Sequence, residues 1–240
     1  MTEHKTTVVL VHGAFAESAS WNGVVERLQE RQLDVVAVAN PLRGLAVDAA
    51  YVRDVLAAIP GPVVLAAHSY GGMVITEAAA GSDQVAALVY ACGFAPDHGE
   101  DAFELSLRFP GSTLGEALAA HPVSTGGDEL VIRQDVFRRQ FCADVPAEQA
   151  AVMGATQRPA TQLALTTGLA AAVPAWRSIP SWFVFGDRDL NIPVALHRFM
   201  ADRAAAKGVH EVPGASHAIT VSQPDAVTAS ILEAVNAVTA

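Results

Sequence analysis

Short apolar runs alternate with longer amphipathic stretches along most of the chain. Six of these runs are rich in β-branched residues, and we predict strands at 7–11, 34–39, 62–67, 85–92, 181–185 and 208–212. Most of the runs are apolar at consecutive positions rather than at every second one. That pattern is typical of strands buried on both faces of a parallel sheet that is covered by helices.

The stretches between the runs have helical periodicity. Apolar side chains in 19–31 and 48–59 recur at i, i+3, i+4 and i+7, with charged residues on the opposite side. A last helix is predicted to begin at Ser222, where Ser222 and Asp225 form a capping-box pattern. The order of strands and helices indicates an α/β fold, with a doubly wound, mostly parallel sheet of about six strands flanked by helices.

The segment 95–178 interrupts this order. It is rich in proline, has two weakly helical stretches around 130–141 and 147–156, and contains no clear strand of the main sheet. A connection of this length is too long for an ordinary loop between two strands. We therefore expect one core domain, residues 1–94 and 179–240, with residues 95–178 inserted as a helical cap. The alternative is a set of peripheral helices without any role as a lid.

Composition narrows the classes of partner. The 240 residues carry a formal net charge of −10, which disfavours nucleic acid and anionic lipid as partners. The N-terminal MTEHKTT is polar and no apolar run approaches 18 residues, so we expect a cytoplasmic protein that does not bind membranes. With two cysteines a disulfide framework is improbable, and Cys92, within VAALVYAC, is expected to be buried.

Residue types that carry chemistry follow three of the predicted strands. Ala67-His68-Ser69-Tyr70-Gly71 comes after PVVLAA and has the small-x-Ser-x-Gly pattern of a nucleophile elbow, in which small neighbours permit a tight turn. Ligands of open α/β sheets bind at these carboxyl ends. A serine placed by chance in a strand-to-helix turn is the alternative for Ser69.

The other two strand ends supply an acid and a base. GDRDLNIP follows SWFVF, and either Asp187 or Asp189 could orient an imidazole or cap the helix that begins near Pro193. His217 follows the last strand in Gly-Ala-Ser-His. The chain order Ser, Asp, His is the order found in α/β-hydrolases, and three such residues at three strand ends favour a catalytic triad.

The sequence resembles the α/β-hydrolase fold superfamily over nearly its whole length. VLVHGAF, AAHSYGGM, FGDRDLNIP and GASHAI carry the resemblance, and HGAFAESASW and HSYGGMVI are similar to small serine esterases of the plant methylesterase and hydroxynitrile lyase group and their bacterial relatives. The family pattern G-x-x-D-x-x-[IV]-P implies that Asp189, and not Asp187, is the acid. Ala67 departs from the glycine that the family usually has there.

The resemblance also implies an oxyanion hole. Its donors would be the backbone N–H groups of Ala14 and Tyr70, with Phe15 as a less favoured second donor. His12 would support the first of these loops rather than act as the base. A serine esterase of this kind needs no metal and no organic cofactor.

These residues predict a hydrolase of small to medium, mostly apolar carboxylic esters, with Ser69 as nucleophile, His217 as base and Asp189 as orienting acid. From the cap and its base we expect Phe15, Met73, Phe103 and Trp176 among the substrate-pocket residues.

Three alternatives keep the same residues. Cofactor-free perhydrolase or haloperoxidase chemistry could use the triad, and a non-catalytic receptor for a small ligand could retain it. The third alternative is hydroxynitrile lyase chemistry. Hydroxynitrile lyases of the family have lysine after the catalytic histidine and threonine at the position of Gly13, whereas this chain has Ala218 after His217 and Gly13 after His12. Both differences argue against lyase activity. A dinucleotide enzyme is set aside because HGAFAES lacks G-x-G-x-x-G.

Overall fold

A six-stranded parallel sheet forms the centre of the protein. The computed structural model describes residues 5–124 and 126–239. The sheet has the order β2-β1-β3-β4-β8-β9, and every neighbouring pair is parallel. This confirms the predicted α/β sheet. Its strands are β1 (Thr7–Val11), β2 (Asp34–Val38), β3 (Val63–His68), β4 (Val85–Ala91), β8 (Ser181–Gly186) and β9 (Gly208–Val212).

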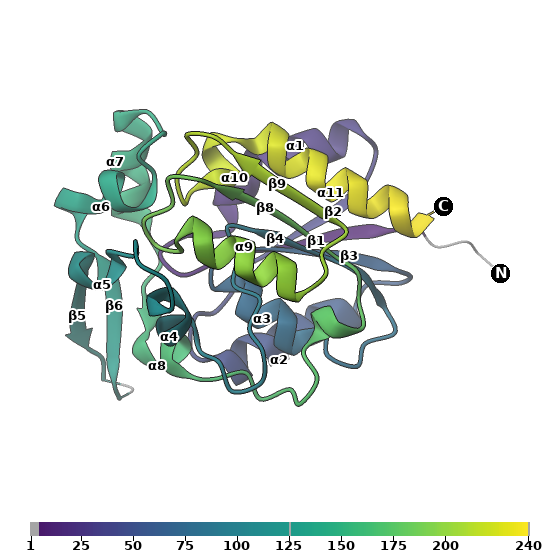
Figure 1. The fold of residues 1–240 in the computed structure, drawn as a ribbon, viewed down its shortest axis with the longest axis horizontal. Coiled ribbons are helices and arrows are strands. Elements are labelled where there is room, and N and C mark those ends of the chain that lie inside the picture. Colours follow the sequence, from purple (N-terminus) through teal and green to yellow (C-terminus); the bar gives the residue numbers. More distant parts are fainter. Residues whose placement is uncertain (1–4, 125, 240) are drawn as a thin grey trace.

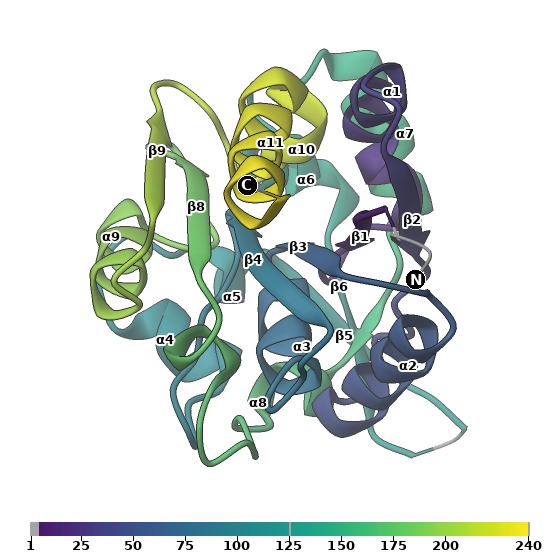
Figure 2. The ribbon, with the colours of Figure 1, turned by 90° about the vertical axis from the view of Figure 1, so that its right-hand side faces the viewer.

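Helices cover both faces of the sheet (Figures 1 and 2). α1 (Asn22–Glu30) and α11 (Pro224–Thr239) lie on one face, while α2 (Leu45–Ala57), α3 (Gly71–Ala78) and α9 (Val194–Arg203) lie on the other. The two layers explain the continuous apolar runs, because β1, β3 and β8 are buried at every position. A 3₁₀ turn, η1 (Ser18–Trp21), precedes α1.

The last helix begins later than predicted. Ser222 ends a short helix, α10 (Ile219–Ser222), and α11 starts at Pro224. The capping box is not formed, because the carboxylate of Asp225 accepts a 2.5 Å hydrogen bond from Arg27 of α1. Proline suits the first position of a helix, since its fixed φ fits and its missing N–H would have no partner there.

The long insertion between β4 and β8 is not wholly helical, which corrects the prediction of a helical cap. β6 pairs antiparallel with both β5 and β7, and α6 starts at Gln134 because residues 128–132 belong to β6. The insertion contains α4 (Ala102–Leu107), α5 (Leu114–Ala117), β5 (Leu118–Pro122), β6 (Asp128–Ile132), α6 (Gln134–Phe141), α7 (Ala147–Thr156), β7 (Ala160–Thr161), α8 (Gln162–Thr166) and the 3₁₀ turn η2 (Ala175–Arg177).

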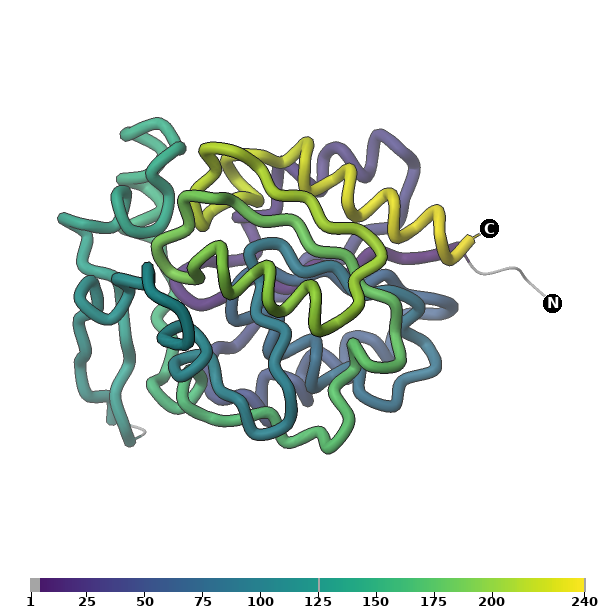
Figure 3. Tube along the Cα trace, in the orientation of Figure 1, coloured from purple at the N-terminus to yellow at the C-terminus, as the bar shows by residue number. Residues whose placement is uncertain are grey.

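Much of the insertion lies at one end of the sheet (Figures 1 and 3). Residues 118–124 and 126–156, in teal, lie beyond the carboxyl ends of the strands. Backbone hydrogen bonds tie the insertion to loops at that end: Phe15 N–H donates to Arg158 at 3.1 Å, and Ala218 N–H donates to Phe141 at 2.9 Å. The loops that follow β1, β3, β8 and β9 therefore meet beneath the insertion.

Two further expectations concern the helices and the cysteines. Within the described ranges, none of the helices is both long enough and apolar enough to cross a bilayer. Cys92 and Cys142 are both free thiols and both buried, as expected for Cys92 from its apolar surroundings.

Candidate active site

Ser69 occupies a sharp turn between β3 and α3. Its φ is +54°, a conformation that costs energy for a residue with a side chain and that clusters at functional sites. The turn is packed against the loop after β1. A Cβ on Gly71 would lie 2.5 Å from the carbonyl oxygen of Val11, and one on Gly13 would lie 2.6 Å from Cβ of Ser69. Small residues are thus required on both sides of the elbow.

His217 and Asp189 form a buried hydrogen-bonded pair. His217 Nδ1 donates to Asp189 Oδ2 at 2.7 Å, and both side chains are inaccessible to solvent. The other carboxylate oxygen, Oδ1, accepts the backbone N–H groups of Asn191 at 2.8 Å and Ile192 at 2.9 Å. Burial alone would raise the pKa of Asp189, but the interactions with His217 and with a second histidine, His197, hold that pKa well below its usual range. Asp189 is therefore a carboxylate.

The imidazole of His217 is held between β3 and the insertion. His68 Nε2 donates to the backbone oxygen of His217 at 2.8 Å, and the two rings are 4.7 Å apart. On another side, the ring of Phe141 in α6 meets that of His217 edge-on at 5.0 Å. Burial lowers the pKa of His68 to about 3, so this ring is neutral and serves as a structural donor.

His68 links the elbow to His217. His68, adjacent to Ser69, makes the contacts with His217 described above, and His217 Nε2 has no hydrogen-bond partner among residues 5–124 and 126–239. The Ser69 hydroxyl and this nitrogen are not hydrogen-bonded to each other in the described structure. In unliganded enzymes such catalytic hydrogen bonds are often long and tighten only with substrate.

Of the two candidate aspartates, only Asp189 contacts the imidazole. Asp187 is exposed, and its Oδ1 accepts the backbone N–H of Gly214 at 2.6 Å. The register expected from the G-x-x-D-x-x-[IV]-P pattern agrees with this placement.

The two candidate oxyanion donors lie beside Ser69. Ala14 and Tyr70 line the same cavity as Ser69, and neither of their backbone N–H groups donates to an acceptor within the described part of the chain. The Phe15 N–H donates to the backbone oxygen of Arg158, so of the two candidate donors Ala14 and Phe15 only Ala14 has a free N–H in the described structure. His12 Nδ1 donates to the Gly13 oxygen at 2.9 Å, and burial lowers its pKa to about 4, so this neutral ring supports the loop.

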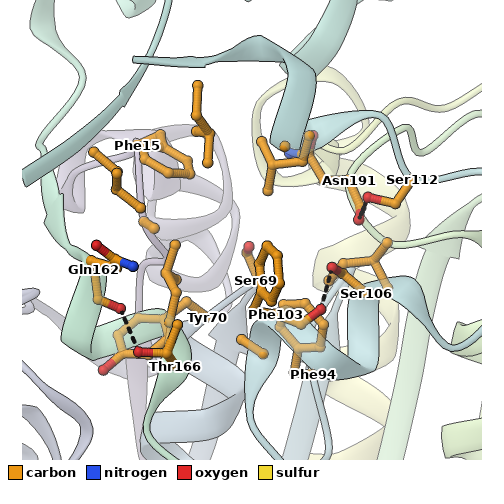
Figure 4. Close-up of a pocket in the computed structure, with 18 of the residues that line it drawn as sticks. Phe15, Ser69, Tyr70, Phe94, Phe103, Ser106, Ser112, Gln162, Thr166 and Asn191 are labelled. Carbon is orange, nitrogen blue, oxygen red and sulfur yellow. Dashed lines mark hydrogen bonds between the residues drawn. The ribbon is translucent and has the colours of Figure 1, made fainter. Parts of the chain in front are cut away.

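A cavity of about 420 Å³ opens above Ser69 (Figure 4). Ser69 lies among apolar walls, with Phe15 and Phe103 on different sides. All lining residues are uncharged: Ala14, Phe15, Ser69, Tyr70, Phe94, Ala102, Phe103, Ser106, Leu107, Ser112, Leu114, Gly115, Leu118, Ala120, Leu130, Gln162, Leu165, Thr166, Asn191 and Ile192.

Two of the four expected pocket residues lie elsewhere. Phe15 and Phe103 line the cavity, whereas Met73 and Trp176 do not. Met73 is fully buried in α3, on the side of that helix that packs into the core. Trp176 closes the base of the insertion, where its Nε1 donates to the oxygen of Pro96 at 2.7 Å and Arg177 stacks on its ring.

A second histidine on the acid escaped the sequence analysis. His197 in α9 donates from Nε2 to Asp189 Oδ2 at 3.2 Å and is fully buried. The available signal was a histidine within the buried face of a predicted helix, beside Leu196 and Met200. A buried histidine side chain needs a hydrogen-bond partner, and the partner of His197 is Asp189.

Cys92, Asp189 and His197 also have ligand atoms within 4.8 Å of one another, which is compatible with a metal ion. The chemistry of the donors favours hydrogen bonding instead. Burial raises the pKa of the Cys92 thiol well above its usual value, whereas metals bind the thiolate. Asp189 Oδ2 is already shared by two imidazoles.

Comparison with known proteins places the chain in a family. The model of the alpha/beta hydrolase family matches residues 8–230. Alpha/beta hydrolase nvfD of Aspergillus novofumigatus is 27% identical over 253 residues, which cover 96% of each protein. Two solved structures are similar in fold. Polyneuridine aldehyde esterase has a TM-score of 0.80 at 20% identity, over 96% of this chain and 99% of its own. Pyrethroid hydrolase PytH has a TM-score of 0.74 at 25% identity, over 97% and 98%. The chain belongs to the alpha/beta hydrolase family.

Proposed function

We propose that the protein is a serine hydrolase of neutral, mostly apolar carboxylic esters. The observation that carries the proposal is the position of Ser69, in a strained elbow that lines an apolar cavity. The adjacent residue, His68, contacts His217, and His217 is hydrogen-bonded to the buried carboxylate of Asp189. Family membership and the similarity to an esterase and to a pyrethroid hydrolase support hydrolysis in general. The cavity supports the narrower substrate class.

The proposed reaction has two halves. His217 Nε2 takes the Ser69 proton as Oγ bonds to the acyl carbon, and the same proton then passes to the departing alcohol. Water replaces the alcohol, and its oxygen bonds to the acyl carbon as His217 Nε2 takes one of its protons. That proton then passes to Ser69 Oγ as the acyl–Oγ bond breaks, which releases the acid and restores both Ser69 and the neutral imidazole. Asp189 holds the imidazole, and the Ala14 and Tyr70 N–H groups stabilise the oxyanion, each contributing roughly 10²–10³ in rate.

The cavity favours substrates without charge. Its walls carry no acidic or basic side chain, and a volume of about 420 Å³ lies in the range of small-molecule pockets. Burying an unpaired carboxylate there would cost several kcal/mol. We therefore propose that the insertion acts as a cap that excludes water and that neutral esters of small to medium size are preferred.

The test compares two serines of the same cavity. Ser69→Ala should lower the rate on p-nitrophenyl acetate by more than about 10³-fold. Ser106→Ala is the matched control, because its hydroxyl donates within its own helix to the oxygen of Phe103, and it should keep the wild-type rate. Equal rates for wild type and Ser69→Ala would refute the proposal.

Labelling and a substrate panel sharpen the result. A fluorophosphonate should modify Ser69, and an intact protein that neither turns over esters nor accepts the label would instead be a small-ligand receptor. A faster rate on the p-nitrophenyl hemisuccinate anion than on the neutral butyrate would contradict the proposed preference for neutral esters. It would not contradict the proposed serine hydrolase reaction.

A further inference from the structure

The carboxylate of Asp189 receives two imidazoles on one oxygen. His217 Nδ1 is 2.7 Å and His197 Nε2 is 3.2 Å from Oδ2, and these histidines come from the loop after β9 and from α9. The orienting acid of a Ser-His-Asp triad needs only one imidazole. The second histidine is therefore unexplained by the proposed reaction.

His197 is built to act as a neutral donor. It is fully buried, and its ring stacks on that of Phe185 in β8 at 4.9 Å with an interplanar angle of 11°. A carboxylate only accepts, so Nε2 carries the proton, and Nδ1 has no partner within the described chain. Burial lowers the pKa of His197, which agrees with a single proton on the ring.

We infer that His197 is a positioning residue for the proposed reaction: it fixes Asp189 and takes part of the acceptor capacity of Oδ2, and in this way it moderates how strongly the carboxylate holds the ring of His217. This inference rests on the proposed function. A carboxylate oxygen that accepts a hydrogen bond from a single imidazole attracts the protonated form of that ring most strongly. This attraction makes the second ring proton harder to remove. A second donor on the same oxygen weakens that attraction.

Other titratable groups around these residues are the same in wild type and variants. His68 faces His217 from β3 and is neutral, and Cys92 faces Asp189 and His197 from the end of β4 as a thiol. Asp144, after α6, is hydrogen-bonded to the hydroxyl of Ser216 next to His217. Glu211 on β9 is paired with Arg198 at the surface, at 2.7 Å and 2.8 Å.

The main experiment measures kcat/KM against pH for three variants. His197→Met removes the hydrogen-bond donor but keeps a side chain that fills the space. In this variant the acid limb, which is the pH range where kcat/KM falls as the pH is lowered, should move to higher pH by about 0.5 to 1 unit. At pH values below both limbs, kcat/KM should fall roughly three- to tenfold relative to wild type, with a smaller change on the plateau. His197→Gln keeps an N–H at similar reach and should restore the limb. His210→Gln, an exposed histidine bonded to Glu233, is the control and should not move it.

A purely structural role gives a different result. If His197→Met and His197→Gln both lower the unfolding midpoint and both keep the wild-type limb, the inference is overturned. The same conclusion follows if Gln and Met shift the limb equally, because the donated hydrogen bond would then not be the cause.

A second measurement needs neither folding of the Met variant nor activity. Ring ¹⁵N NMR of the wild type should find His197 as the Nε2–H tautomer, neutral at pH 7. An Nδ1–H tautomer or a protonated ring at pH 7 would overturn the inference. If Ser69→Ala retains full activity while this NMR result holds, the proposed function has failed and the His197–Asp189 contact has not.

Discussion

The phenol of Tyr70 donates a 2.8 Å hydrogen bond to the carboxylate of Asp48 in α2. Asp48 is fully buried and also accepts the backbone N–H groups of Arg43, at 2.9 Å, and Gly44, at 3.4 Å. The loop that contains Arg43 and Gly44 also contacts the insertion, since Thr161 N–H donates to the backbone oxygen of Leu42 at 3.1 Å. Tyr70, whose backbone N–H is one of the two proposed oxyanion donors, is thus anchored through its ring and Asp48 to the loop 42–44, which contacts the insertion.

Tyr70→Phe should therefore lower kcat more than it changes KM. Loss of the phenol leaves a buried carboxylate short of one donor, which costs about 1–3 kcal/mol of unfolding free energy, and it loosens the N–H that stabilises the oxyanion. We expect a fall in kcat of roughly tenfold, since one complete oxyanion donor is worth about 10²–10³. Steady-state kinetics on a p-nitrophenyl ester, with urea unfolding, measure both effects.

Tyr90→Phe is the matched control for this prediction. The Tyr90 hydroxyl is hydrogen-bonded to Thr76 Oγ1 at 2.9 Å and is equally buried, but Tyr90 does not line the cavity. It should lose stability without the selective loss of kcat. Equal kinetic effects of the two substitutions would remove any special role for Asp48 and Tyr70.

Ala120→Phe should narrow the range of esters that are accepted. Ala120 lies on the cavity side of β5, opposite Leu130, and is exposed, so a larger side chain can be added without overpacking the core. Activity on p-nitrophenyl octanoate should fall several-fold relative to acetate, since each methylene lost from an apolar pocket is worth about 1 kcal/mol. Ala119→Phe, on the other side of the same strand, should leave the octanoate-to-acetate ratio as it is. A ratio that does not respond to Ala120→Phe would mean that acyl chains do not reach β5.

Gly13→Ala tests the close contact between the β1 loop and the elbow. The added methyl would lie 2.6 Å from Cβ of Ser69 and 2.8 Å from the oxygen of His68, so one of the two loops must move. A displacement of about 1 Å can cost about 10²-fold in rate, and we expect a loss in kcat/KM of that order. Gly115→Ala, whose methyl would meet no atom within 4 Å, is the control for packing and should keep the wild-type unfolding midpoint. Wild-type activity of Gly13→Ala would show that the elbow tolerates movement.

The strands and the chain positions of the site were predictable because both follow from local pattern. Consecutive apolar residues in the VVLV and WFVF runs specify buried parallel strands, and parallel strands bring Ser69, Asp189 and His217 to one edge. Asp189 and Asp187 could not be separated by such patterns alone. They differ in what the loop geometry lets each reach, which is His217 for one and the Gly214 amide for the other.

The insertion and the supporting residues were less predictable because they depend on contacts between distant segments. Residues 128–132 form a strand only because β5 and β7 pair with them, and local periodicity there also suits a helix. Trp176 looked like a pocket residue by its type, yet Arg177 and the oxygen of Pro96 hold it at the base of the insertion. Asp48 has its role through Tyr70, 22 residues away in sequence, and His197 through Asp189, 8 residues away. Each pair joins two different structural elements, so local sequence pattern does not reveal it.

Acid should destabilise the protein through buried histidines, among them His12, His68 and His197. Burial lowers the pKa of His12 from 6.5 to about 4 and that of His68 from 6.5 to about 3, so between these values the unfolded chain binds protons that the folded chain does not. The free energy of unfolding therefore decreases as the pH falls from 6.5 towards 4, by about 1.4 kcal/mol per pH unit for each histidine once the unfolded chain is fully protonated. Urea unfolding at pH 7, 6, 5 and 4.5 measures this slope. His68→Gln can still donate to the His217 oxygen but cannot titrate, and it should reduce the slope by about one proton. A slope unchanged by His68→Gln would mean that His68 is protonated, or dissociated from its site, in the folded protein at these pH values.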